Sequence, residues 1–126
     1  MIKVEELFIA PTATVLETLR KLDETGQRIL FIAPEGHLKA VITDGDIRKF
    51  FLRGGTPDQT VDHAANYHPL SVSVSERGKA RSILQEHCID ALPVLNKRGI
   101  ITDIARFVNS CVFVRLLFAR SNLPSW

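Results

Sequence analysis

The feature that most constrains the fold is an internal repetition, because the same order of segments occurs twice along the chain. In each half, a stretch with helical apolar spacing is followed by two short apolar runs. Matching positions in the two halves lie about 60 residues apart. A chain of 126 residues can bury one core or two very small ones. The two copies are therefore predicted to form a single compact α/β (α+β) module.

The first copy carries clear start and stop signals. The apolar spacing predicts a helix from Thr14 to Thr25, with Thr14 and Glu17 in the pattern of a capping box and Gly26 at its end. Residues 28–33 and 38–43 are apolar on both faces, and the turn-forming sequence between them predicts a hairpin. A second helix is expected to begin at Thr43 or Asp44 and to stop at Gly54-Gly55. The first unit therefore reads helix, strand, strand, helix.

The second copy repeats this order in a shortened form. A strand is expected at residues 71–74, then a Ser75 cap, a helix through Leu84, a strand at 91–95, and a tight turn before Thr102. After Asp103 the apolar spacing predicts a longer helix. It would run through the following residues: Ile104, Phe107, Val108, Cys111 and Val112. The predicted organisation is repeat 1 at 1–55, a connector at 56–69, repeat 2 at 70–107, and a C-terminal helix and tail at 108–126.

Composition excludes several classes of function. Sixteen Lys and Arg against fourteen Asp and Glu give a net charge of +2, too balanced for the positive field of a nucleic-acid-binding protein. Cys88 and Cys111 lack disulfide or metal-ligand spacing and are predicted to be reduced thiols in the core. The densest apolar stretch, 104–118, is interrupted by polar residues, so no membrane span is expected. With no signal-peptide pattern at the N-terminus, the protein is expected to be cytoplasmic.

The strongest candidate site lies at residues 40–48, where an apolar strand ends in a hydroxyl and two carboxylates as a helix begins. A helix N-terminus offers unpaired amides that suit a phosphate, and the Thr43 hydroxyl can add a hydrogen bond. The Asp46 carboxylate can accept bonds from both hydroxyls of a ribose. Together these groups point to a nucleotide. Helix capping by Thr43 and Asp44, with a favourable dipole at Asp46, would explain the same residues without a ligand.

The sequence Thr43-Asp44-Gly45-Asp46-Ile47-Arg48, preceded by a capped helix and repeated once, resembles the signature of cystathionine-beta-synthase (CBS) domains. Thr43, Asp46 and Ile47 match the Thr-x-x-Asp-hydrophobic motif residue by residue. The resemblance covers residues 1 to about 107 and is more specific in the first copy. It is similar to the CBS pairs attached to sugar-nucleotide nucleotidyltransferases and to sugar-phosphate isomerases.

The resemblance implies two intertwined CBS repeats that bind AMP, ADP, ATP or S-adenosylmethionine in a cleft between them and regulate an attached or partner enzyme. Such a module would be a homodimer, would not itself be an enzyme, and would need no cofactor. The motif would place phosphate at Thr43 and ribose at Asp46. Further binding candidates are Asp44, Ile42, Arg48 and Lys49, with Ile9 or Phe31 near the base.

The second copy departs from the motif. Thr102 is followed directly by Asp103, whereas the motif separates the two by two residues. The two side chains therefore cannot take the relative places of Thr43 and Asp46 on a helical turn. Thr102 and Asp103 remain ligand candidates, and at most one competent nucleotide site is expected.

Two other readings stay open. A CBS-like pair whose site has decayed could serve only as a dimerisation or interaction scaffold, and the shortened second motif favours it. Asp44-Gly45-Asp46 also resembles the Asp-x-Asp of magnesium-dependent phosphatases, but the chain is too short to supply the remaining groups of such a site. The four histidines show no zinc or dyad spacing.

Overall fold

The computed structural model describes residues 3–89 and 91–106. A short 3-10 turn, Val4–Leu7, precedes the first regular elements of repeat 1. The regular elements that follow in chain order are α1 (Val15–Thr25), β1 (Ile29–Ile32), β2 (Ala40–Thr43), α2 (Asp44–Leu52), β3 (Val72–Ser73), α3 (Ala80–His87), β4 (Ala91–Leu95) and β5 (Ile101–Arg106).

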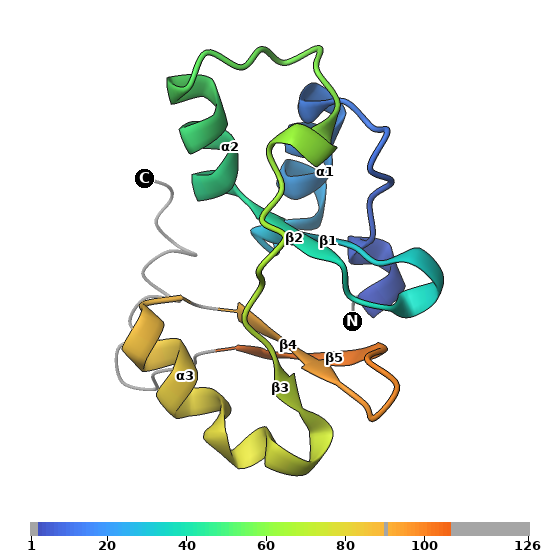
Figure 1. The fold of residues 1–126 in the computed structure, drawn as a ribbon, viewed down its shortest axis with the longest axis vertical. Coiled ribbons are helices and arrows are strands. Elements are labelled where there is room, and N and C mark those ends of the chain that lie inside the picture. Colours follow the sequence, from blue (N-terminus) through green and yellow to red (C-terminus); the bar gives the residue numbers. More distant parts are fainter. Residues whose placement is uncertain (1–2, 90, 107–126) are drawn as a thin grey trace.

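The two copies share one topology. Phe8 pairs in parallel with Phe31 of β1, and β1 pairs antiparallel with β2. In the second copy β3 pairs in parallel with β4, and β4 pairs antiparallel with β5. In each copy a helix crosses from the first segment to the middle strand, as parallel pairing requires. Figure 1 shows the first copy above and the second below, with their strands meeting in the middle.

The capping box of α1 forms as the sequence predicts. The Glu17 amide donates to Thr14 Oγ1 over 3.0 Å, and the Thr14 amide donates to Glu17 Oε1 over 2.8 Å. Gly26 ends the helix in the left-handed region, at φ 67°. These bonds satisfy first-turn amides that the helix itself leaves without partners.

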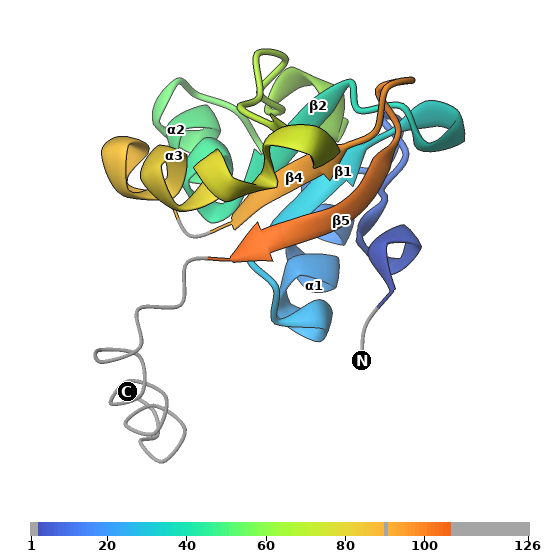
Figure 2. The same ribbon diagram turned by 90° about the horizontal axis from the view of Figure 1, so that it is seen from below.

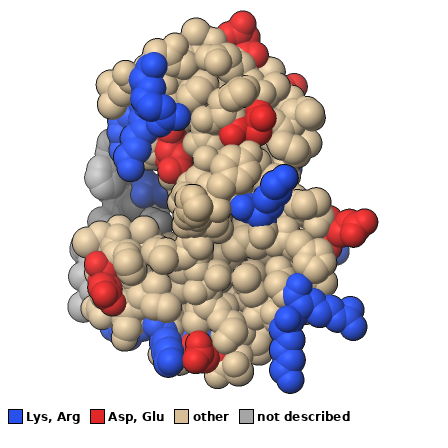
Figure 3. Space-filling model, viewed as in Figure 1, with Lys and Arg blue, Asp and Glu red and all other residues tan. Residues whose placement is uncertain are grey.

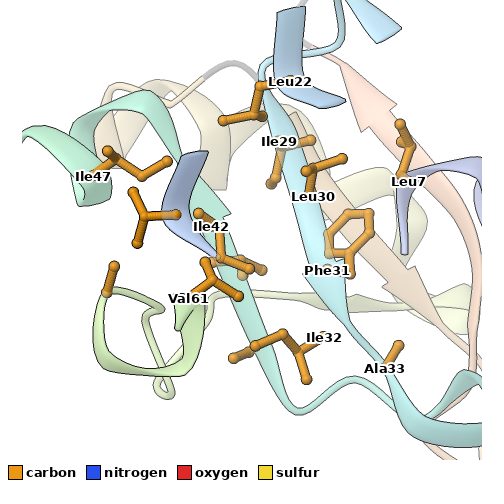
Figure 4. Close-up of a cluster of buried hydrophobic side chains, with 14 of the residues drawn as sticks. Leu7, Leu22, Ile29, Leu30, Phe31, Ile32, Ala33, Ile42, Ile47 and Val61 are labelled. Atoms are coloured by element: carbon orange, nitrogen blue, oxygen red, sulfur yellow. The ribbon is translucent and has the colours of Figure 1, made fainter. Parts of the chain in front are cut away.

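The main core lies on β1, whose four residues are all buried. Figure 4 shows Leu30 and Phe31 of this strand among side chains from the N-terminal segment, both helices of the first copy and the connector. Ala91 and Ile101 of the second copy belong to the same cluster. On β4 the neighbouring positions Leu92 and Val94 instead join a second cluster under α3. Successive side chains of β4 point to opposite faces of the strand and pack in different clusters. The strand therefore contributes to the cores of both copies.

Segments that are far apart in sequence contact one another where the two copies meet. The Val61 amide donates to the Ala13 carbonyl over 2.7 Å, so the connector holds the start of α1. Asn66 and Val41 exchange backbone hydrogen bonds, and His37 pairs with Ile100 at the tips of the two hairpins. The prediction of two intertwined repeats in a mixed helix and sheet fold is confirmed.

Two local predictions in the second copy are wrong. Ser75 does not cap a helix: it lies in a 3-10 segment, Val74–Lys79, with its Oγ 3.2 Å from that of Ser73, and α3 begins at Ala80 without a side-chain cap. The helix expected after Asp103 does not begin within the described residues 104–106 either. Residues 104–106 continue β5 and pair with β4, because Ile104 and Ala105 lie on opposite faces and each packs on a different core. The rest of the expected helix, and the tail, lie outside the described residues.

Candidate functional site

A cleft lies between the two copies, on the side of the molecule where Figure 1 shows α2 and α3. Its volume is about 1060 Å³. The first copy contributes the start of β1, part of β2 and the first turns of α2, whereas the second contributes the end of α3 and β4. Asn66 and Leu70 of the connector complete the wall. The volume lies just above the range for pockets that bind small molecules, about 300–1,000 Å³.

A second capping box positions the side chains at the start of α2. The Asp46 amide donates to Thr43 Oγ1 over 3.2 Å, while Asp46 Oδ2 accepts from the Thr43 amide and hydroxyl, each over 3.0 Å. Both side chains are partly exposed and line the cleft. Capping engages Oδ2 alone among the two carboxylate oxygens, so Oδ1 remains available to a ligand. The capping and binding explanations of the motif are thus compatible.

Cationic side chains from two elements flank this box. Arg48 and Lys49 of α2 and Arg28, just before β1, line the cleft and are exposed. Figure 3 shows Lys and Arg side chains gathered over α2, above the hollow between the two halves. The acidic groups of the lining are Asp44 and Asp46.

The structure brings together five of the residues that the sequence singled out. Thr43, Asp44, Asp46, Arg48 and Lys49 all line the cleft.

The other sequence candidates lie elsewhere. Ile42 and Phe31 are completely buried in the main core, so neither can flank a base in this cleft. Their strands are covered on both faces, as their continuous apolar pattern indicates. Ile9 lines smaller cavities on another part of the surface.

Thr102 and Asp103 lie on β5 and do not line the cleft. The Thr102 hydroxyl donates to the Val94 carbonyl over 3.3 Å, within the second sheet. Asp103 is half exposed and pairs with Arg77 at 3.1 Å. In the first copy the matching threonine ends its strand and caps a helix, whereas Thr102 lies inside a strand. The second motif, in which the threonine and the aspartate are adjacent, therefore has a different local structure from the first.

Sequence reasoning missed the opposite wall. Lining residues that were not selected as candidates include Arg28, Asn66, Leu70, Leu84, Gln85, Cys88, Ile89, Ala91 and Pro93. They come mainly from the connector and the second copy, and no motif marks them. The prediction that Cys88 is a core thiol is wrong: it is exposed, at φ 55°, at the end of α3, while Cys111 lies outside the described residues. A left-handed residue at a helix end is usually glycine or asparagine, so no local pattern predicts a cysteine in this position.

Asp62 and Tyr67 of the connector are among the titratable groups whose pKa values are shifted. A hydrogen bond from the Thr60 hydroxyl lowers the pKa of Asp62, and the neighbouring His63 acts in the same direction. Partial burial raises the pKa of Tyr67, and the Asp62 charge adds to that increase. Neither group lines the cleft.

The described part of the chain has neither a metal-binding group of side chains nor a membrane-spanning helix. No group of three or more His, Cys, Asp or Glu side chains is arranged to hold a metal ion among residues 3–89 and 91–106. Within the same ranges, no helix has both the length and the apolar character that crossing a bilayer requires.

Comparison with known sequences identifies the first copy. Residues 2–53 match the CBS domain family. Over 96 residues the chain is 30% identical to the arabinose 5-phosphate isomerase GutQ of Escherichia coli O6:H1, and over 91 residues it is 29% identical to GutQ of Salmonella typhi. These matches cover 75% and 71% of this chain. The chain spans less than a third of the length of these relatives, 30% and 28%.

Solved structures match both copies. A CBS domain protein from Pyrobaculum aerophilum, complexed with AMP, superposes with a TM-score of 0.66 at 19% identity, covering 94% of this chain and 100% of that one. The CBS domain pair of protein MJ0100, complexed with 5′-methylthioadenosine and S-adenosyl-L-methionine, gives a TM-score of 0.69 at 16% identity, covering 93% and 99%. The first copy is therefore a CBS domain by sequence, and both copies together have the fold of a CBS domain pair.

Proposed function

We propose that this chain is a regulatory module that binds an adenine nucleotide in the cleft between its two CBS repeats. The observation that carries the proposal is the start of α2: Thr43 and Asp46 face a cleft whose opposite wall belongs to the second repeat. A ligand there touches both repeats. The solved relatives complexed with AMP and with S-adenosyl-L-methionine support the ligand class.

The groups of the cleft suit the three parts of a nucleotide. A phosphate would lie at the first turn of α2, beside the Thr43 hydroxyl, where amides and the helix dipole favour negative charge. The Asp46 carboxylate would accept bonds from the ribose. The base would lie against the apolar part of the wall, which includes Leu70, Ile89 and Pro93. None of these groups is assigned a catalytic step, and the module requires no cofactor.

Regulation follows if the ligand prefers one packing of the two repeats over another. Binding can shift an equilibrium only by its difference in affinity for the two states. The target would be an attached or partner enzyme in the cytoplasm. The curated relatives make a sugar-phosphate isomerase one candidate, and a nucleotidyltransferase is another.

The test is ligand-induced stabilisation. AMP, ADP, ATP and S-adenosylmethionine are titrated while the unfolding midpoint is measured; a ligand at 100 times its Kd should add about 2.7 kcal/mol of stability. Asp46→Asn retains an oxygen that can cap the helix but removes the charge, so it should weaken binding about tenfold with little loss of stability. Glu17→Gln makes the same change in the α1 capping box, outside the cleft, and should leave affinity unchanged. Equal affinities of the two variants would contradict the proposed site.

A scaffold without ligand is the second candidate. Exposed apolar side chains favour it: Leu16 near the start of α1 is 42% exposed, and Phe51 and Leu52 at the end of α2 are 37% and 81% exposed. The two helices contact each other, and the connector that follows α2 holds the start of α1 through a hydrogen bond from the Leu16 amide to the Pro57 carbonyl. Such side chains suit a homodimer interface. If no adenine compound stabilises the chain and sedimentation shows a dimer that Leu52→Lys dissociates, the scaffold function is preferred.

A further inference from the structure

One of the smaller cavities lies beside the first hairpin and has no described residue in common with the cleft between the repeats. It is lined by residues 8–11 of the N-terminal segment and by residues 32–34, at and after the end of β1. Its volume is about 370 Å³, and all of its lining side chains except Lys39 are apolar. This volume lies near the lower end of the range for pockets that bind small molecules, about 300–1,000 Å³. The cavity, called the hairpin pocket below, can therefore hold one large apolar side chain.

A backbone hydrogen bond and two prolines fix the shape of the hairpin pocket. The Ile9 amide donates to the Phe31 carbonyl over 2.9 Å, which holds the N-terminal segment against β1. Pro11 and Pro34 each have a fixed φ and no amide hydrogen, so their parts of the lining are rigid and offer no backbone donor. A preformed pocket loses little free energy to ordering when a side chain enters it.

The tips of the two hairpins lie side by side next to this pocket. The Leu38 amide of the first tip donates to the Gly99 carbonyl of the second over 3.2 Å. Lys39 follows Leu38 and Arg98 precedes Gly99, so the two cationic residues flank this hydrogen bond. Lys39 also lines the hairpin pocket. The pocket and the two tips therefore form one continuous surface, to which both repeats contribute.

This surface is positively charged. Residues 34–39 and 96–100 include three cations, Lys39, Lys97 and Arg98, and one acidic residue, Glu35, and all four are exposed. None of the three cations takes part in the ion pairs found among the described residues. Figure 3 shows Lys and Arg side chains over these tips, at the right of the view, beside an acidic group. Cations around an apolar pocket attract a partner that carries the opposite charge.

We propose that this surface binds a segment of a partner protein in which one large apolar side chain is flanked by carboxylates. The apolar side chain would fill the hairpin pocket, and the carboxylates would lie against Lys39, Lys97 and Arg98. The pocket favours a protein segment over a nucleic acid, whose phosphates would use the cations alone. The segment would contact both repeats, so its affinity would depend on how they pack. The proposal does not rest on the adenine nucleotide site, since the two sites share no described residue.

The test uses a fluorescein-labelled synthetic peptide with a central phenylalanine and glutamates on both sides, titrated with the full chain while fluorescence anisotropy is measured. The same peptide with a central alanine has equal charge but no anchor for the pocket. The phenylalanine peptide is expected to bind at least about tenfold more tightly, because its ring is removed from water in the pocket. Both peptides should bind more weakly at high salt, which screens the cations.

Variants separate the pocket from the charges. Ala10→Leu enlarges an exposed lining residue and should weaken the phenylalanine peptide about tenfold while leaving the weaker alanine peptide unchanged, a difference that misfolding would not produce. Lys39→Gln and Arg98→Gln should each weaken both peptides about threefold and reduce their salt dependence. Lys79→Gln removes the same charge from a side chain that is 68% exposed and lies in neither the pocket nor a tip, so it should leave both affinities unchanged.

Equal affinities of the phenylalanine and alanine peptides would overturn the proposal, because the tips would then be a general anion-binding surface that suits a nucleic acid or an anionic lipid as well. Binding of the phenylalanine peptide that Ala10→Leu leaves unchanged would place the peptide elsewhere and would also overturn it. The same titrations repeated with saturating AMP leave these criteria unchanged, so failure here is distinct from failure of the nucleotide site.

Discussion

At the scale of single residues, side chains of this protein combine roles that sequence patterns treat as alternatives. Thr43 and Asp46 form a complete capping box and line the cleft at the same time. The box fixes the Asp46 side chain in one orientation. A carboxylate held in this way loses less conformational freedom on binding a ligand than a freely rotating one.

Tyr67 should report the charge of Asp62. Its pKa is raised first by partial burial and then by the Asp62 carboxylate. Asp62→Asn should lower the pKa of Tyr67 but leave it above its ordinary value, because burial remains. The chain has one tyrosine, so the ultraviolet absorbance of tyrosinate gives a single titration.

The raised pKa of Tyr67 also determines how stability depends on pH. Because folding raises the pKa of Tyr67, its contribution to stability is present below the unfolded pKa and is lost as pH rises through the folded one. A Tyr67 pKa that falls to its ordinary value in Asp62→Asn would mean that burial has no effect. No change at all would exclude coupling to Asp62.

At the scale of elements, the end of α2 depends on a close contact between a ring and the backbone. A Cβ on Gly55 would stand 2.3 Å from ring atoms of Phe50, which is only 5% exposed and is stacked near Arg53. The ring is enclosed and cannot move aside freely. The glycine is therefore required by packing and not by a positive φ.

Gly55→Ala should lower the free energy of unfolding by about 1–3 kcal/mol, as overpacking in a core does. Gly78→Ala is the matched control, because nothing lies within 4 Å of a Cβ there. That variant should be neutral or slightly stabilising. Urea denaturation measures the free energy of unfolding of both variants. Equal stabilities would show that the Phe50 ring moves aside to accommodate the methyl group.

At the scale of the whole molecule, the two repeats share a core and should unfold together. Ile101 of β5 is 5% exposed and packs in the cluster built mainly from the first repeat. Ile101→Ala should cost about 2–5 kcal/mol. Far-ultraviolet circular dichroism and the fluorescence of Tyr67, which lies in the connector, should still give one coincident transition.

Ile83→Ala, on α3 beside the second cluster, provides the comparison. This variant should also lower the free energy of unfolding, by a smaller amount, since Ile83 is only partly buried. The two probes should again give coincident transitions. Separate transitions for the two probes in either variant would mean that the repeats are independent units.

The local sequence determined the elements of the first repeat, because each boundary has its own short-range signal. The Thr14 and Glu17 box, the Gly26 stop and the hairpin from 28 to 43 all form as predicted. The part of the cleft at the start of α2 could also be predicted from the sequence, since Thr43 and Asp46 interact within one helical turn. Where signals were weak the prediction failed: β5 continues to Arg106 because β4 offers it a pairing partner, which apolar spacing alone does not reveal.

Only the tertiary structure decided which residues meet across the cleft. Arg28, Leu84 and Cys88 come from distant segments, and none has a motif. It also removed Ile42 and Phe31 from the candidate site by burying them, and it left Thr102 inside a strand. Helix caps and turns are fixed by interactions among near neighbours along the chain. A binding surface depends on how whole repeats pack, and that packing is the sum of many weak apolar contacts that no short stretch of sequence encodes.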